Sequence, residues 1–124
     1  MLKEVKKMKN AVAVYLDGEL DQYAAAELKS KIDVEAELSG KKNLIIDLTD
    51  VSLMDSSGIG LIIGRYKTLA PLGGFVALSG GNDGVKRVIK LSGIEKIIQT
   101  YDTASDADTA LGRERRSIKD EKLS

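Results

Sequence analysis

The chain of 124 residues contains neither cysteine nor histidine. This absence excludes thiol nucleophiles, the usual zinc ligand sets, and every catalytic triad or dyad that depends on histidine. It also excludes disulfide bonds, so a hydrophobic core must stabilise the fold. Apolar residues make up 43% of the sequence, and a domain of this size buries roughly two-thirds of the surface that its unfolded chain exposes. We therefore expect one domain with a single core.

The sequence also lacks net charge and long apolar runs. Its 19 basic residues balance its 19 acidic ones, whereas proteins that bind nucleic acid usually carry a clear excess of Lys and Arg. No apolar run is long enough to span a bilayer, and the N-terminus begins with charged residues rather than the apolar segment of a signal peptide. These observations favour a cytoplasmic protein that binds neither nucleic acid nor membrane.

Hydrophobic periodicity in the first third of the chain predicts a hairpin followed by a helix. Residues 2–8 and 11–16 have the pattern of two strands, and Asp17-Gly18 is expected to end the second one. Asp21 is then placed to cap a helix. The apolar positions of this helix recur in steps of three and four, at Ala25, Leu28, Ile32 and Ala36.

The middle of the chain predicts a buried central strand and a second helix. Residues 44–48 form a compact apolar run, which is typical of a strand at the centre of a sheet that helices cover. A polar stretch over residues 49–55 follows. Helical spacing then continues until Pro71, with apolar side chains at Ile59, Ile62, Ile63, Tyr66 and Leu69.

The last third of the chain continues the alternation of strands and helices. A strand over residues 75–78 precedes a third helix, and a short strand near residues 97–98 follows it. Residues 105–108 resemble the capping signal of a last short helix, whereas residues 112–124 are almost entirely polar and are expected to form a disordered tail. The pattern predicts an α/β fold in which one domain, residues 1–111, has a mixed β-sheet with helices packed against it.

The segment that joins the central strand to the second helix is the candidate site. Its sequence, MDSSGIG over residues 54–60, contains several small and polar side chains. One interpretation is an ordinary helix start, in which Ser56 or Ser57 caps the helix and the glycines allow close packing. The other is a functional site. A dinucleotide loop is disfavoured because its glycine turn would follow the strand directly, and the chain has no G-x-x-x-x-G-K-[ST] loop for nucleotide phosphates.

Three separated motifs, taken in order, carry a resemblance to a known family. Residues 55–67, DSSGIGLIIGRYK, resemble the signature of STAS-domain anti-sigma factor antagonists, especially those of sporulation. Residues 16–21 resemble the family's entry from a strand into the first helix, and parts of residues 85–98 resemble its third helix and last strand. The loop over residues 79–82 and the charged tail depart from the family pattern, which leaves the identity of the partner open.

The resemblance implies a phosphorylation-controlled binding module that works by partner switching, not an enzyme, with no cofactor and no metal site. In that family the unphosphorylated antagonist binds an anti-sigma factor that is also a serine kinase, and so frees a sigma factor for transcription. The kinase uses ATP to phosphorylate the first serine of the motif, Ser56 here, which abolishes binding. A PP2C-type phosphatase removes the phosphate. We expect the free protein to be a monomer.

The same interpretation predicts roles for the residues around Ser56. Asp55 positions the phosphoacceptor hydroxyl, and Ser57 is expected to cap the helix. Gly58 and Gly60 are expected to let the backbone of a partner approach. Asp55, Ser57, Gly58 and Gly60 are therefore predicted to contribute to partner binding.

Some alternatives stay open at this point. Asp21 either is an ordinary helix cap or also contacts the kinase, and Ile59 belongs either to the core or to an exposed docking contact. At the level of function, the chain is alternatively a constitutive STAS scaffold or transporter-associated subunit, because the fold is reused in such assemblies. The glycine spacing after Ser57 also leaves open a nucleotide-binding domain.

Overall fold

The computed structural model describes the backbone of residues 1–123 and the side chains of residues 1–113. Strands and helices alternate along most of the chain, with two short 3-10 helices between them. In chain order the elements are β1 (Leu2–Lys7), β2 (Val12–Leu20), α1 (Gln22–Ser39), β3 (Leu44–Met54), α2 (Ser56–Leu69), η1 (Ala70–Leu72), β4 (Val76–Ser79), α3 (Asp83–Ser92), η2 (Ile94–Lys96), β5 (Gln99–Tyr101) and α4 (Ala104–Leu123).

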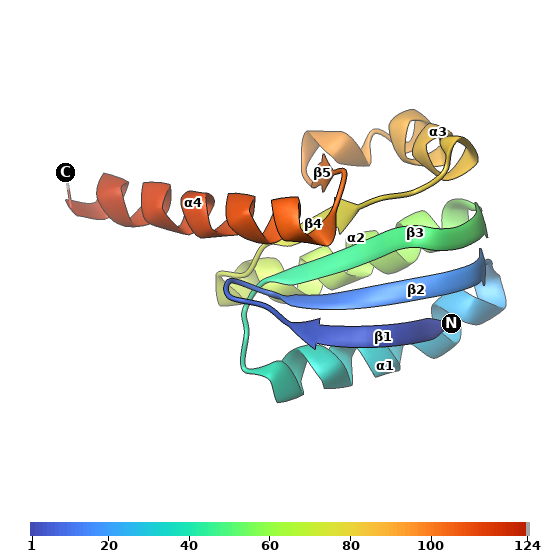
Figure 1. Cartoon of the computed structure of the whole chain (residues 1–124), viewed down its shortest axis with the longest axis horizontal. Coiled ribbons are helices and arrows are strands. Elements are labelled where there is room, and N and C mark those ends of the chain that lie inside the picture. The colour runs from blue at the N-terminus through green and yellow to red at the C-terminus, as the bar shows by residue number, and fades with distance from the viewer. Residues whose placement is uncertain (124) are drawn as a thin grey trace.

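The described strands form one sheet in the order β1-β2-β3-β4-β5. β1 and β2 pair antiparallel as a hairpin, and the other neighbours pair parallel. Successive crossovers step in one direction along the sheet, and because such crossovers are right-handed, their helices lie on one face. Figure 1 shows α1 and α2 behind the sheet, whereas α4 begins in front of β4 and extends past the end of the sheet. The predicted α/β fold, with a mixed sheet and helices packed against it, is confirmed.

Each face of the sheet has its own hydrophobic cluster. The larger cluster lies beneath α1, α2 and α3 and includes Leu28, Ile62 and Ile89. The smaller one lies on the other face, where small strand residues such as Ala13 contact α4 residues such as Ala107. The expectation of a single core is therefore wrong, because a sheet that is covered on both faces buries two layers.

Two strands are longer than the sequence pattern predicts. β2 continues through Asp17-Gly18 to Leu20, and β3 continues through the polar stretch to Met54. The pairing of β2 with β3 shifts register at two places, between Tyr15 and Asp17 and between Gly18 and Glu19. Such bulges interrupt the alternation of buried and exposed residues by which a strand is recognised. The short strand predicted near residues 97–98 lies slightly later, in β5.

The last helix begins one residue before the predicted capping signal, with Thr103 Oγ1 accepting a 3.1 Å hydrogen bond from Asp106 N, and it is longer than expected. α4 runs from Ala104 to Leu123 and therefore passes through the predicted domain boundary at residues 111–112. The side chains of residues 114–124, and the whole of Ser124, lie outside the described residues. The predicted disorder of residues 112–124 stays a prediction for that reason.

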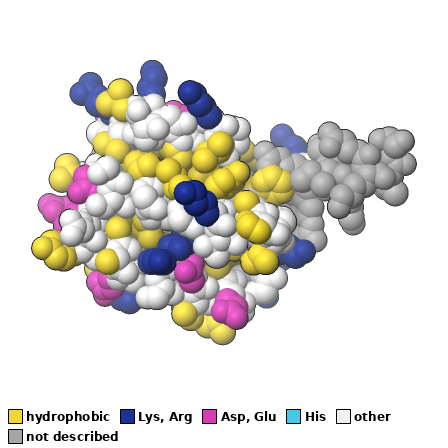
Figure 2. Space-filling model, turned by 180° about the vertical axis from the view of Figure 1, so that it is seen from behind, with side chains coloured by type: hydrophobic (Ala, Val, Ile, Leu, Met, Phe, Trp, Pro, Cys, Tyr) yellow, Lys and Arg dark blue, Asp and Glu magenta, His cyan; other side chains and the backbone are white. Residues whose placement is uncertain are grey.

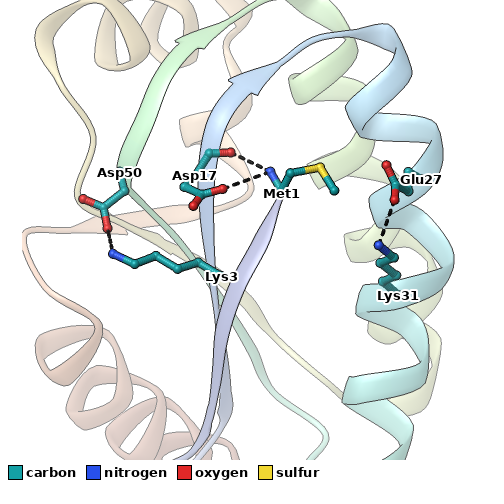
Figure 3. Close-up of polar contacts among 6 residues, drawn as sticks. All are labelled: Met1, Lys3, Asp17, Glu27, Lys31 and Asp50. Atoms are coloured by element: carbon teal, nitrogen blue, oxygen red, sulfur yellow. Dashed lines mark hydrogen bonds and ion pairs between the residues drawn. The ribbon is translucent and has the colours of Figure 1, made fainter.

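Polar contacts fasten the first strand to its neighbours (Figure 3). The amino group of Met1 donates a hydrogen bond of 2.6 Å to the backbone oxygen of Asp17 and lies 3.4 Å from a carboxylate oxygen of the same residue. Lys3 on β1 forms an ion pair with Asp50 on β3. The hairpin is thus held to the same end of the sheet at which β2 and β3 finish.

On α1, Lys31 donates a 2.8 Å hydrogen bond to Glu27 one turn earlier. Titration of the Glu27 carboxyl tests whether Glu27 and Lys31 are paired on α1. The hydrogen bond and the positive charge of Lys31 hold the pKa of Glu27 below its usual value of 4.5. A lowered pKa means that the stabilisation is present above about pH 4.5 and is lost as the pH falls through the folded-state pKa. Lys31→Met should raise the pKa of Glu27 in an NMR titration of its side-chain carboxyl. An unchanged pKa in this variant would contradict the pairing.

Candidate functional site

Three helices begin at the edge of the sheet where the parallel strands end. Leu20, the last residue of β2, pairs with Met54, the last residue of β3. The next residue along each strand is an aspartate that caps the following helix, and Asn82 caps α3. Binding sites of open parallel sheets lie outside the carboxyl ends of the strands. We call this surface the carboxyl edge, defined here by residues 19–23, residues 52–56 and Asn82.

Ser56 lies on the surface at the start of α2. It is the first helical residue and its side chain is exposed. Asp55 precedes it in an extended conformation, and its carboxylate accepts a 2.8 Å hydrogen bond from the backbone N–H of Ser57. Asp55 is therefore the cap of α2, in place of the predicted Ser57. A carboxylate is a strong capping group because it also interacts favourably with the positive end of the helix dipole.

Asp21 has the same arrangement at the start of α1. Its side chain accepts a 2.9 Å hydrogen bond from the backbone N–H of Ala24, and its own backbone oxygen accepts another from Ala25. The prediction that Asp21 caps this helix is confirmed. The side chain is only half-buried, so one face of the carboxylate is left at the surface. Contact with a kinase stays a prediction.

The glycines at positions 58 and 60 face opposite directions. A Cβ atom on Gly58 would lie 2.8 Å from Met54 Sδ and 3.1 Å from Leu20 Cδ2, too close without a shift of these side chains. Gly58 therefore allows α2 to pack on the strand ends, in contrast to the predicted approach of a partner's backbone. Gly60 is exposed, and a Cβ there would have no heavy atom within 4 Å.

Ile59 belongs to the core. Its side chain is only 9% exposed and forms part of the larger hydrophobic cluster. Of its two competing explanations, the structure supports the core position, because little of the side chain is left for a docking contact. The surface around Ser56 is thus formed by the strand ends and the first helical turns, together with Gly60 one turn further on.

Sequence reasoning missed a buried arginine on α2. Arg65 is 4% exposed, and its Nε lies 2.8 Å from a carboxylate oxygen of Asp33 on α1. The ion pair has a short distance but lacks hydrogen-bond geometry, since Nε has no hydrogen-bond partner. Spacing from the buried Gly58 and Leu61 could have indicated this position, because Arg65 falls on the same stripe in helical steps of three and four. It links α2 to α1 behind the site.

Asn82 was also missed. It joins the loop over residues 79–82, which departs from the family pattern, to the candidate site. Its side-chain oxygen accepts a 2.8 Å hydrogen bond from Val85 N and so caps α3. Its side-chain nitrogen donates to the backbone oxygens of Val51 and Ser52, at 3.3 Å and 3.2 Å. These carbonyls belong to the part of β3 that extends beyond its pairing with β4. Asn82 therefore holds the strand that leads into Ser56.

The described residues show neither a metal site nor a membrane-spanning helix. No three acidic side chains within residues 1–113 are grouped closely enough to hold a metal ion. Among the helices in the described part of the chain, none combines the length and the apolar character that crossing a bilayer requires. The carboxyl edge is instead a surface on which polar and apolar side chains lie around Ser56.

Comparison with known proteins places this arrangement in a family. Residues 3–107 match the family model described as the STAS domain. The chain belongs to the STAS domain family. Its match covers β1 to β5 and the first turn of α4, so this STAS domain occupies almost the whole described fold.

Relatives of this STAS domain include anti-sigma factor antagonists. The domain is 32% identical over 108 residues to an anti-sigma F factor antagonist of Paenibacillus polymyxa, covering 87% of this chain and 92% of the relative. It is 35% identical over 95 residues to the anti-sigma-B factor antagonist of Bacillus subtilis, covering 77% and 85%.

The solved structures that resemble this STAS domain include the anti-sigma factor antagonist SpoIIAA in two forms. The unphosphorylated form is 26% identical with a TM-score of 0.72, covering 88% of this chain and 96% of that one. The phosphorylated form, from Bacillus, is 28% identical with a TM-score of 0.61, covering 86% and 94%. The predicted similarity to SpoIIAA is confirmed.

The opposite environments of the two glycines predict opposite effects of alanine. Gly60→Ala should raise the free energy of unfolding by roughly 0.5–1 kcal/mol, because alanine costs less entropy than glycine in an exposed helix. Gly58→Ala gains the same propensity, but overpacking a filled core costs typically about 1–3 kcal/mol, so a net loss of stability is expected. Chemical denaturation of both variants measures the difference. Equal stabilisation by both alanines would contradict the packing of Gly58 on Met54.

Proposed function

We propose that this STAS domain is an anti-sigma factor antagonist that docks through its carboxyl edge and is switched by phosphorylation of Ser56. The observation that carries the proposal is the exposed hydroxyl of Ser56 on the first turn of α2, beside the capping carboxylate of Asp55. Relatives named as anti-sigma factor antagonists support the role. SpoIIAA, which has been solved in phosphorylated and unphosphorylated forms, supports the switch.

The local geometry favours a phosphate that points outward. The backbone N–H of Ser57 already donates to Asp55, and Gly58 N donates to the backbone oxygen of Asp55 at 3.0 Å. A phosphoserine adds about −1.5 to −2 charge near neutral pH, directly beside this carboxylate. The helix dipole offsets the added charge by about 0.3–1 kcal/mol at an exposed site. The modified domain should therefore stay folded and carry a more negative surface.

The effect of the phosphate should fall on binding. A charge that is left desolvated and unpaired in an interface costs roughly 2–5 kcal/mol. A shift of a two-state population from 1:99 to 99:1 needs about 5.5 kcal/mol. One phosphate at the centre of the docking surface therefore comes close to a complete switch without refolding the domain.

The partners follow from this role. The unphosphorylated domain would bind an anti-sigma factor that is also a serine kinase, and so free a sigma factor for transcription. That kinase would transfer the γ-phosphoryl group of ATP to the Ser56 oxygen, with release of ADP and of the hydroxyl proton. A PP2C-type phosphatase would hydrolyse the phosphoserine and restore binding. All of these steps would take place in the cytoplasm.

The proposal is tested with Ser56→Ala, Ser56→Asp and, as a matched control, Ser57→Ala. Incubated with ATP and the anti-sigma factor/serine kinase, wild type and Ser57→Ala should be labelled, and Ser56→Ala should not. Ser56→Ala should still bind the kinase, whereas Ser56→Asp should bind at least tenfold more weakly because of its fixed charge. Labelling of Ser56→Ala, or wild-type affinity of Ser56→Asp, would show that the switch lies elsewhere.

A further inference from the structure

The last part of β3 exposes more side chains than a regular strand does. From Leu48 onward every third residue is buried, namely Leu48, Val51 and Met54, and the two residues between each pair are exposed. A regular strand alternates in steps of two. The register shifts between β2 and β3 account for the difference, because a bulge re-aims the side chains that follow it.

This irregularity puts an apolar side chain at the surface near the end of β3, the strand that leads into Ser56. Leu53 is 63% exposed and lies three positions before Ser56. It is also held in place, because Asn82 donates hydrogen bonds to the backbone oxygens of Val51 and Ser52 just before it. Tyr23, on the first turn of α1, is 82% exposed at the same edge. Rigidly presented apolar side chains are suited to act as anchors in an interface.

Acidic side chains lie on the β2 side of this apolar position and at the strand ends. Glu19 pairs in register with Leu53, and Asp21 and Asp55 follow the paired strand ends. Lys3 on β1 already forms an ion pair with Asp50. Figure 2 views the molecule from behind, and at its left end, on the side of the carboxyl edge, acidic and apolar side chains lie next to each other. A complementary partner would place cations around an apolar socket.

We propose that Leu53 is the apolar anchor by which the anti-sigma factor/serine kinase docks beside Ser56, and that the partner receives it in an apolar socket bordered by Lys or Arg side chains. The inference rests on the proposed function and specifies the partner's surface. Docking would bury this leucine and bring the Ser56 hydroxyl to the kinase in the same step.

Exposure alone does not single out Leu53. Apolar side chains also reach the surface on the face of α1 and α2 (Figure 2), and Leu72 is 64% exposed. Leu72 lies in η1, beyond the other end of α2, and the 14 residues of that helix span about 21 Å. Leu53 differs from Leu72 by its position beside Ser56 and the carboxylates, not by its exposure. Leu72 is therefore its matched control.

The test compares Leu53→Ser with Leu72→Ser in binding to purified anti-sigma factor/serine kinase from the same organism. Both side chains are exposed, so both variants should melt close to the wild type. Loss of a buried leucine contact should weaken the binding of Leu53→Ser by about 10- to 100-fold, whereas Leu72→Ser should stay within about twofold of wild type. Equal affinities of wild type and Leu53→Ser would overturn the anchor. Failure of wild type to bind the kinase would instead overturn the proposed function, and the anchor with it.

The charge of the partner's surface is tested separately. Glu19→Gln should weaken the binding several-fold at low salt, and the effect should shrink as salt screens the charges. Glu37→Gln, in the last turn of α1 far from the carboxyl edge, is the control and should leave affinity unchanged. A wild-type affinity that does not fall with rising salt would overturn the cationic border of the socket.

Discussion

Strands β2 and β3 finish side by side because Leu20 pairs with Met54. This pairing sets the positions of the two capping aspartates, which follow it directly, and so the starting points of α1 and α2. It also favours a glycine at position 58, since a Cβ atom there would crowd both paired side chains. The site therefore depends on the sheet: a shift of one strand against the other would move both caps and the exposed serine together.

The zero net charge of the chain does not make the two ends of β2 and β3 alike. Glu19 and the two capping aspartates lie at the carboxyl edge, where β2 and β3 finish. At the opposite end of these strands, the hairpin turn and the loop before β3 carry Lys9 and Lys41, and Lys41 donates a 2.8 Å hydrogen bond to the backbone oxygen of Lys9. Such a separation orients an approaching charged partner even when the total charge is zero. The total charge of a small domain is thus a poor guide to its surface.

The sequence predicts the helix starts of this fold well because capping is local. The Asp21 cap and the periodic apolar stripes each act within one or two turns, and the structure has helices where these signals occur. The ends of β2 and β3 escaped prediction because their pairing contains bulges, which depend on the register of two distant segments. In the last part of β3 only one residue in three is apolar and buried. A strand is recognised by alternation in steps of two, so this stretch resembles a loop in the sequence.

The candidate site was predicted in part for the same reason. Ser56 was recognised from a motif, and its exposure agrees with the expected role. The orientation of Gly58, the burial of Arg65 and the contacts of Asn82 could not be read from the motif, because each depends on a neighbour that is remote in sequence. In physical terms, local signals indicate which residues begin an element, whereas tertiary packing decides which way their neighbours face.

The cap at Asp55 has a consequence for how quickly the domain can respond. The carboxylate already accepts the hydrogen bond of the Ser57 N–H group, which an added anion would otherwise bind. Under the proposed function, a phosphate on Ser56 would therefore find this N–H group already bonded and would point into solvent. The response time of the switch would then be limited by the enzymes that add and remove the phosphate and by diffusional encounter with the partner.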